Sequence, residues 1–179
     1  MQTTKLKLRI TFLFTVVLTS PAFQSARAQE KPLYEIQAAI IYNVVKFTQW
    51  ANESEGKEFV MGVYGDENLY GALKTAYQNK SKGAKKIVIN NLSSLDEVLS
   101  CDLFFLGDKK LKDFPKAKEL ATNKPILCVT GAPSYGKKGS AVNLTTVDNR
   151  MVIEINEQTI SQGGFKVSGT LLTMAKVIK

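Results

Sequence analysis

The sequence lacks the residue types that most often perform acid–base or metal chemistry in proteins. It contains no histidine, which removes the commonest general base, the usual base partner of serine and cysteine nucleophiles, and the commonest zinc ligand. Its acidic residues are scattered and form no run of spaced carboxylates like that of a calcium loop. We therefore predict no catalytic residue, no metal site and no cofactor, and we classify the chain as a non-enzyme.

One segment imitates a phosphate-binding loop. Gly131-Ala-Pro-Ser-Tyr-Gly136-Lys137 follows an apolar run and matches such a loop through its lysine. A phosphate loop then needs serine or threonine to bind magnesium, and a helix, whereas Lys138 is followed by Gly139-Ser140 and a predicted strand. We interpret the segment as a surface turn, and keep Tyr135 and Lys137 as candidate contacts to a ligand or partner.

Three further residues are candidates for binding a partner or ligand. Phe47 and Trp50 end the first predicted helix; core packing is the favoured interpretation for both, and a partner-facing aromatic is the alternative. Arg150 has the side chain that binds a carboxylate or phosphate through two nitrogens, but it could instead pair with Glu154 on the same predicted strand. The structural pairing is favoured.

The sequence has two cysteines, Cys101 and Cys128. Each lies at or inside an apolar run, so two buried thiols are favoured, and a Cys101–Cys128 disulfide is the alternative in an oxidising compartment. One bridge would not be the main support of a domain this long, so a hydrophobic core must stabilise it.

The first 28 residues have the features of a cleavable signal peptide. Lys5, Lys7 and Arg9 precede the apolar residues 10–18, and Ala26-Arg-Ala28 forms the cleavage signal. The apolar run spans roughly 14 Å, too short for a bilayer core of about 30 Å. We predict export to the periplasm, cleavage before Gln29, and no direct membrane insertion.

Removal of the signal peptide changes the charge balance. The chain has 24 basic and 16 acidic residues, and four of the basic residues (Lys5, Lys7, Arg9 and Arg27) lie in the signal peptide. The remaining 20 basic and 16 acidic residues give a net charge of +4. The surplus is small and interspersed, so we do not expect nucleic-acid binding. Residues 29–179 have the usual length of a single domain.

The pattern of apolar residues predicts an α/β fold. An amphipathic helix is expected over 33–50, with Ile36, Ile40, Val44 and Phe47 on its buried stripe. Short apolar runs then alternate with helical segments, which indicates a mostly parallel sheet flanked by helices. The expected strands are Phe59–Tyr64, Ile87–Ile89, Leu103–Leu106 and Ile126–Val129, and the expected helices are Glu67–Lys80, Ser93–Ser100 and Asp113–Thr122.

The last third of the chain departs from this alternation. Ala141–Thr146 and Arg150–Asn156 are separated by three residues, which allow an antiparallel hairpin but no crossover. After Gly163-Gly164 a closing helix is expected from Ser168, its N-cap, with Leu171, Leu172, Ala175 and Ile178 on the apolar face. If the sheet binds a ligand, the expected place is a cleft at the carboxyl ends of its parallel strands, near Gly65, Gly107 and Gly131–Gly136.

Six segments in order resemble the YfiR-like (YfiR/HmsC-like) family of exported bacterial proteins. The resemblance covers Tyr34–Ile178 and rests on the following residues: Ala38–Trp50, Gly62-Val-Tyr-Gly65, Cys101-Asp-Leu-Phe-Phe-Leu106, Pro125–Thr130, Asn149–Asn156, and Val167-Ser168 with Leu171, Leu172 and Ala175. Asp102 stands where the family usually has histidine, and Ala51 where it has proline.

The resemblance implies a non-catalytic periplasmic regulator. Its expected partner is the periplasmic sensor domain of an inner-membrane signalling protein, a diguanylate cyclase or a sensor kinase, so that the role would be control of cyclic-di-GMP and adhesion. A homodimer is compatible with this role. The alternative that stays open is a periplasmic small-molecule binding module that serves a sensor or transporter.

Overall fold

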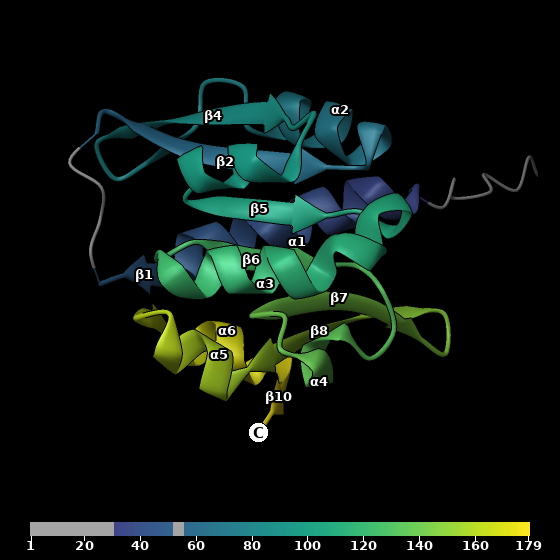
Figure 1. Ribbon diagram of the computed structural model, residues 1–179. Coiled ribbons are helices and arrows are strands. Elements are labelled where there is room, and N and C mark those ends of the chain that lie inside the picture. Colours follow the sequence, from purple (N-terminus) through teal and green to yellow (C-terminus); the bar gives the residue numbers. More distant parts are fainter. Residues whose placement is uncertain (1–30, 52–55) are drawn as a thin grey trace, which may run out of the picture. The chain divides into compact units, whose positions relative to one another are not determined.

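An eight-stranded sheet runs through the protein, and helices cover both of its faces (Figure 1). This computed structural model describes residues 31–51 and 56–179, so the predicted signal peptide lies outside the described residues. The strands, in spatial order, are β10 (Ala175–Ile178), β8 (Arg150–Asn156), β7 (Val142–Val147), β6 (Leu127–Thr130), β5 (Leu103–Leu106), β2 (Glu58–Tyr64), β4 (Lys85–Asn91) and β3 (Ser81–Lys82).

Most neighbouring strands are parallel, as the sequence predicts. The antiparallel pairs are β7–β8 and β3–β4. In the β7–β8 hairpin Asp148 and Asn149 have positive φ values of 48° and 59°, which is typical of the tight turn that matches the twist of paired strands. A second, two-stranded sheet pairs β1 (Thr48–Trp50) with β9 (Phe165–Val167).

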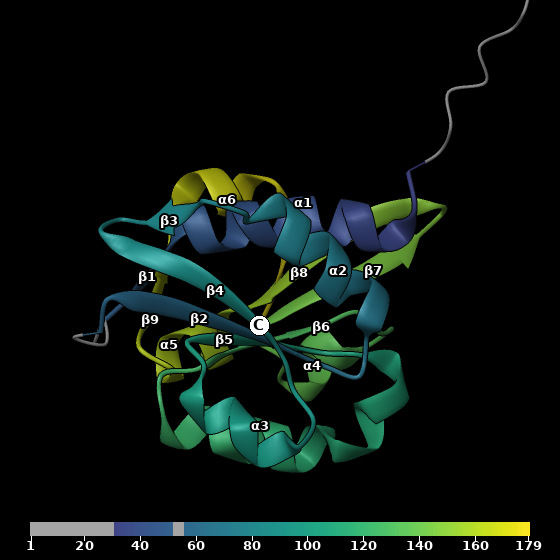
Figure 2. The ribbon, with the colours of Figure 1, turned by 90° about the horizontal axis from the view of Figure 1, so that it is seen from above.

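Helices lie in two layers on the two faces of the sheet. The helices are α1 (Leu33–Phe47), α2 (Glu67–Ala76), η1 (Leu95–Ser100), η2 (Asp108–Asp113), α3 (Phe114–Asn123), α4 (Tyr135–Lys138), α5 (Glu157–Gln162) and α6 (Gly169–Thr173). Figure 2 shows α1, α2 and α6 on one side and α3 on the other. Helix η1 begins with a capping box formed by Ser94 and Glu97.

The central strands are buried on both faces because they separate two hydrophobic clusters. On β5, Leu103 and Phe105 pack with α1 and α2, whereas Phe104 and Leu106 pack with Val98 and other residues of the η1 and α3 layer. This is why these strands appear in the sequence as continuous apolar runs rather than as alternating ones.

The first predicted helix is shorter and turned relative to the prediction. It ends at Phe47, and the next three residues form β1, in which Thr48 and Trp50 are buried and Gln49 is exposed. The buried residues of α1 are Gln37, Ala38, Ile41, Val44 and Val45, whereas Ile36 is exposed. The buried face of α1 is therefore rotated about the helix axis, by about one residue, from the face that the sequence predicts.

The predicted closing helix begins at its predicted N-cap, but it is shorter than predicted and a strand follows it. Ser168 does cap a helix, since its Oγ accepts a hydrogen bond from Leu171 N at 3.4 Å, but α6 ends at Thr173. Residues Ala175–Ile178 instead form β10, which pairs in parallel with β8. The physical reason is backbone pairing: without β10 the backbone groups along one side of β8 would lack a strand partner.

The approach of two loops at the carboxyl ends of β2 and β5 yields a test of the fold. A Cβ atom added to Gly107 would lie 2.5 Å from the Gly65 carbonyl oxygen, so Gly107→Ala must displace backbone. We expect it to lower the free energy of unfolding by about 1–3 kcal/mol. Gly71→Ala is the control, because nothing lies within 4 Å of the added atom in α2, and alanine there should raise stability by up to about 1 kcal/mol. Urea unfolding measures both; equal effects would contradict the loop packing.

Candidate functional site

The loops at the carboxyl ends of β2 and β5, where the sequence predicts a cleft, pack against each other. Gly65 has a φ of +87° and lies under the Lys110 side chain. The Lys110 Nζ lies 4.8 Å from the centre of the Tyr64 ring, and the Tyr64 hydroxyl lies 3.3 Å from an Asp113 carboxylate oxygen. Glycine is required here for close approach of the chain rather than for contact with a ligand.

The loop that imitates a phosphate-binding site is followed by a four-residue helix, α4, and then by β7. Tyr135 is half-buried, with its ring 4.9 Å from that of Phe114 in an edge-to-face contact, and Lys138 Nζ lies 4.1 Å from its centre. Lys137 is exposed. Tyr135 therefore has packing partners on α3 and α4, and Lys137 is a solvent-facing cation beside it.

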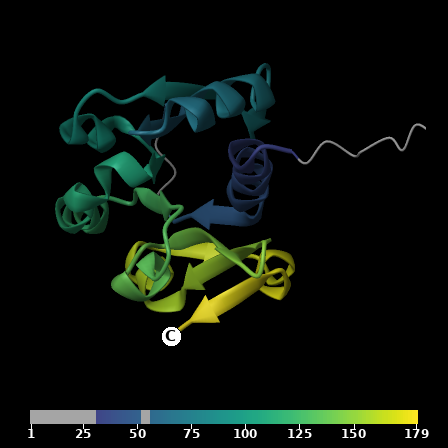
Figure 3. The same ribbon diagram turned by 90° about the vertical axis from the view of Figure 1, so that its right-hand side faces the viewer.

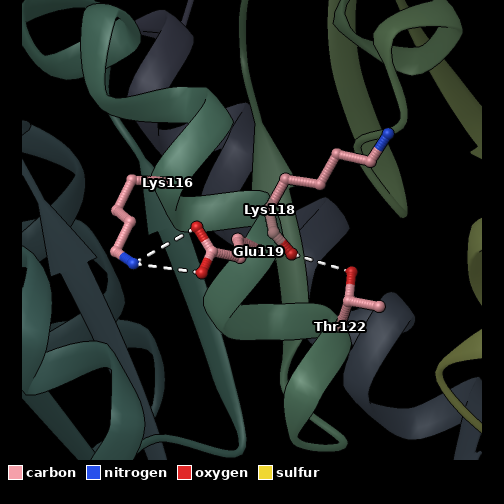
Figure 4. A network of polar contacts seen from close by, with 4 residues as sticks. All are labelled: Lys116, Lys118, Glu119 and Thr122. Atoms are coloured by element: carbon pink, nitrogen blue, oxygen red, sulfur yellow. Dashed lines mark hydrogen bonds and ion pairs between the residues drawn. The ribbon is translucent and has the colours of Figure 1, made fainter.

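Helix α3 covers this part of the sheet, and the hydrogen bonds of its Lys116, Lys118 and Thr122 side chains are exposed to solvent. Lys116 and Glu119 form an ion pair of 3.2 Å with both side chains more than half exposed, so the pair adds little stability (Figure 4). The Lys118 side chain extends away from that pair, and its Nζ donates to the Lys138 carbonyl oxygen at 3.2 Å. This bond links α3 to the end of α4.

A chain of polar side chains crosses the sheet from β6 to β10, buried from Thr130 to Glu154 and ending at the exposed Lys176. The Thr130 hydroxyl lies 2.7 Å from Asn143 Oδ1, and Asn143 Nδ2 donates to Glu154 Oε2 at 2.9 Å. The other Glu154 oxygen lies 3.8 Å from Lys176 Nζ. Glu154 is only 7% exposed, and a buried carboxylate needs such partners because its desolvation is costly.

Two further hydrogen bonds, one buried and one partly buried, hold α4 and its C-cap on this polar face. Asn156 Nδ2 donates to the Gly136 carbonyl oxygen at 2.9 Å, and the Thr159 hydroxyl donates to that of Gly139 at 3.2 Å. A Cβ atom on Gly136 would lie 2.7 Å from Glu154 Oε2. The polar face of β8 is therefore buried beneath α4, which the sequence analysis does not predict.

The favoured pairing of Arg150 with Glu154 was wrong. Arg150 is the first residue of β8, opposite Val147 beside the hairpin turn, and it is exposed. The Glu154 oxygens are engaged by Asn143 and Lys176 instead. Arg150 thus lies on the surface and away from the buried carboxylate.

Phe47 and Trp50 have different environments. Trp50 is 6% exposed and packs edge-to-face against Phe59 at 5.0 Å and Phe165 at 5.6 Å. Its ring nitrogen donates to the Asp102 carbonyl oxygen at 3.2 Å. Trp50 is a core residue, as favoured. Phe47 is half-buried and lines a small surface pocket with Lys166 and Val167.

The two cysteines are free and buried in the structure, in the cluster between the sheet and α3. Burial raises the pKa of the Cys101 thiol to about 11 and that of Cys128 to about 12. Thiols with such pKa values stay protonated at neutral pH and react slowly. The structure holds the two cysteines as separate thiols, and thiol labelling tests the disulfide alternative.

Three exposed apolar side chains lie within residues 172–177, at and just before β10, the outermost strand at that end of the sheet (Figures 1 and 3). Leu172, Met174 and Val177 are 38%, 50% and 39% exposed. Beside β10 is a groove of about 440 Å³, whose apolar lining includes Ile155, Ile160, Phe165, Val167, Leu172 and Val177. We call β10 together with this groove the C-terminal edge.

Two other cavities are large enough for small molecules. One, of about 720 Å³, lies between α1 and α2 and is lined mainly by small residues, with Glu35 and Glu67 at its rim. The other, of about 580 Å³, lies at the amino ends of β2, β5 and β6 and includes Lys57 and Lys124. The second lies at the opposite ends of the strands from those at which the sequence predicts a cleft. The first includes Glu67 and Asn68, which follow Gly65 closely at the carboxyl end of β2.

Two searches of the described residues bear on the class of site. Across residues 31–51 and 56–179, no three or more carboxylate or thiol side chains come together in a group that could hold a metal ion. Within the same residues no helix combines the length and the apolarity that a bilayer span requires.

Comparison with known proteins gives a family and a fold. Residues 34–176 match the model of a family described as YfiR/HmsC-like. No curated protein sequence matches the chain. A solved structure of a conserved domain protein from Vibrio cholerae is similar, with a TM-score of 0.53 and 15% identity over 82% of this chain and 60% of that one. At this identity the likeness shows the α/β fold alone.

Two further solved structures resemble the chain more weakly. An ABC domain in complex with L-Trp from Streptococcus pneumoniae has a TM-score of 0.49 and 11% identity over 67% of this chain and 55% of that one. CD0873, a substrate binding protein with adhesive properties from Clostridium difficile, has a TM-score of 0.47 and 16% identity over 69% of this chain and 55% of that one. The chain thus spans between 55% and 60% of the solved chains it resembles.

The buried amide–carboxylate bond predicts an effect of Asn143→Ala. The variant leaves the Thr130 hydroxyl and the Glu154 carboxylate with one fewer buried partner each, so we expect a loss of about 3 kcal/mol in the free energy of unfolding. Asn91→Ala is the matched control, because Asn91 Nδ2 donates to Glu67 at 2.9 Å in an exposed position and should cost less than about 1 kcal/mol. Equal losses would show that burial of Glu154 is not the deciding factor.

The state of the cysteines predicts the outcome of thiol labelling. At pH 8 the folded protein should react slowly with iodoacetamide, since the raised pKa values of Cys101 and Cys128 keep both thiols protonated. Denatured protein that was never reduced should react at both cysteines, as a reduced sample does. Failure of the unreduced, denatured sample to react would reveal a disulfide.

Proposed function

We propose that this chain, which belongs to the YfiR/HmsC-like family because the family's model matches residues 34–176, is a periplasmic regulatory protein that docks on a membrane-bound signalling enzyme. The family match carries this proposal. The family's periplasmic regulators supply the coarse role, and the C-terminal edge, with its exposed apolar side chains, supplies a surface that docking could use.

The proposal includes the finer expectations drawn from the sequence. Export would remove residues 1–28, and residues 29–179 would form the working domain in the periplasm. The enzyme would be a diguanylate cyclase, so that docking alters cyclic-di-GMP and adhesion. The chain itself would perform no chemistry on a substrate.

A protein without catalytic groups regulates by differential binding. If it binds one conformational state of the enzyme more tightly than another, it shifts the equilibrium between those states by the ratio of the two affinities. A tenfold ratio corresponds to about 1.4 kcal/mol. Such a shift changes the activity of the enzyme without changing its amount.

A small-molecule binding module is the second candidate. The groove between α1 and α2, at about 720 Å³, has the volume of a ligand site. A ligand there would contact α1, which also packs against α6 beside the C-terminal edge. The two functions are compatible, because a ligand could then change how the protein docks.

The regulatory role predicts the phenotype of a deletion. Removing the gene should raise cyclic-di-GMP and adhesion while the amount of cyclase stays constant, because a docked inhibitor is lost. The exported chain should reverse both effects, and a version that lacks residues 2–28 should not, since the membrane would separate it from the sensor domain. Unchanged cyclic-di-GMP would contradict the cyclase as partner; full rescue by the unexported version would contradict docking in the periplasm.

A further inference from the structure

We propose that β10 is a recognition edge, to which an extended acidic segment of the partner adds as a further strand of the sheet. This inference deepens the proposed docking function and rests on it for the nature of the partner. Its physical basis is the unpaired side of β10, the apolar groove beside it and the positive charge around it.

The strand order leaves one side of β10 without a strand. Within residues 31–51 and 56–179, the strand paired with β10 is β8, through Ala175–Ile178 opposite Ile153–Asn156. In any strand that has a neighbour on one side only, alternate N–H and C=O groups point outward. These groups match the hydrogen-bonding pattern of another extended chain, so the edge selects for a strand rather than for a helix.

The opposite edge of the sheet is built differently. There β3 has two residues and belongs to a hairpin that carries Lys80, Lys82, Lys85 and Lys86. Lys82 Nζ lies 4.5 Å from the centre of the Trp50 ring. A very short strand rich in lysine is a common way to prevent edge pairing. By contrast, β10 has four residues and exposes Val177.

Side chains next to β10 supply a place for apolar residues of the added strand. Val177 lines the groove together with Ile155 and Phe165, and Leu172 forms another part of its wall. Alternate side chains of an added strand would point toward this face, and the others toward the face of Lys176, because side chains alternate along a strand. The groove therefore favours apolar residues at every second position of the partner segment.

The charges around β10 favour acidic residues at the remaining positions. The Lys176 side chain is 60% exposed, and Lys166 and Lys179 are exposed as well. Of the nearby acids, Glu154 is buried and already paired with Asn143 and Lys176, whereas Glu157 is exposed at the groove. The solvent-facing charge at this edge is therefore mainly positive, and complementary charge steers a partner to it.

The same charges argue against a second copy of this chain as the occupant. Pairing of β10 with β10 would bring the Lys176 and Lys179 side chains of two copies onto one small surface, and like charges on paired strands destabilise the pair. A heterologous segment with glutamate or aspartate avoids this repulsion. We therefore assign the edge to a partner segment, with length of about four to six residues to match β10.

A peptide experiment tests the edge directly. The probe is an acetylated and amidated peptide of four Val-Glu repeats, and its matched control is the same peptide with lysine in place of glutamate. We expect the acidic peptide to bind at least fivefold more tightly and to slow amide hydrogen exchange in β10. Two further probes carry N-methyl groups on every second residue, one on the valines and the other on the glutamates. Only alternate N–H groups of an added strand face β10. One of the two probes should therefore lose binding, and the other should retain it.

Variants of the protein locate the binding. Lys176→Glu should weaken the acidic peptide at least fivefold, whereas Lys116→Glu, the same change on exposed α3, should alter it less than twofold. Binding that is insensitive to Lys176→Glu, protection outside β10, or no binding at millimolar peptide would overturn the proposal. Dimerisation of the free protein with protection of β10, measured by sedimentation and hydrogen exchange, would make a second copy the occupant and would also overturn it.

Complementation separates this inference from the proposed function. In a deletion strain with raised cyclic-di-GMP, Lys176→Glu should fail to restore the level at equal abundance, and Lys116→Glu should restore it. Full restoration by Lys176→Glu would overturn the recognition edge while leaving the regulatory role intact. If the deletion leaves cyclic-di-GMP unchanged, the proposed function fails, and the peptide result still decides whether β10 is a recognition edge.

Discussion

Burial of both faces of β2, β5 and β6 constrains the rest of the structure. The backbone N–H and C=O groups of a buried strand have no water to bind, so they must pair with a neighbouring strand on each side. Further strands are therefore needed on both sides, until the outermost strand can bind water. Among the residues that the structure describes, the strands of this sheet with a strand neighbour on one side only are β3 and β10, the two ends of the strand order. The location of a surface able to accept another strand is therefore a consequence of how the core is built.

The two edges are connected to the core in different ways. At β10, the ion pair of Lys176 with Glu154 continues through Asn143 to Thr130, so a surface cation is joined to a polar chain that reaches β6. Near β3, Lys82 instead contacts the ring of Trp50, which packs between Phe59 and Phe165. At the C-terminal edge an exposed lysine thus pairs with a buried glutamate. At the β3 edge a lysine instead contacts a buried aromatic ring.

Features with local causes could be predicted from the sequence. The apolar runs predicted β5 and β6, and the short connection predicted the β7–β8 hairpin. Features that depend on distant neighbours could not. Leu171, Leu172, Ala175 and Ile178 have helical spacing, yet the last two lie in a strand because β8 offers an edge to pair with. Glu154 is buried although it is charged, since its partners Asn143 and Lys176 come from other strands. For the same reason the carboxyl-end cleft was expected where two glycine loops in fact pack together.

The central claim is that the protein acts by docking its C-terminal edge on a membrane signalling enzyme. Site-specific photo-crosslinking in living cells tests it most directly, with a photoreactive amino acid placed at Val177 in one strain and at exposed Lys137 on α4 in another. The account predicts that the Val177 position crosslinks to the periplasmic domain of a membrane-bound cyclase, through an acidic segment, and that the Lys137 position does not. Crosslinks to that domain from Lys137 and none from Val177 would contradict it.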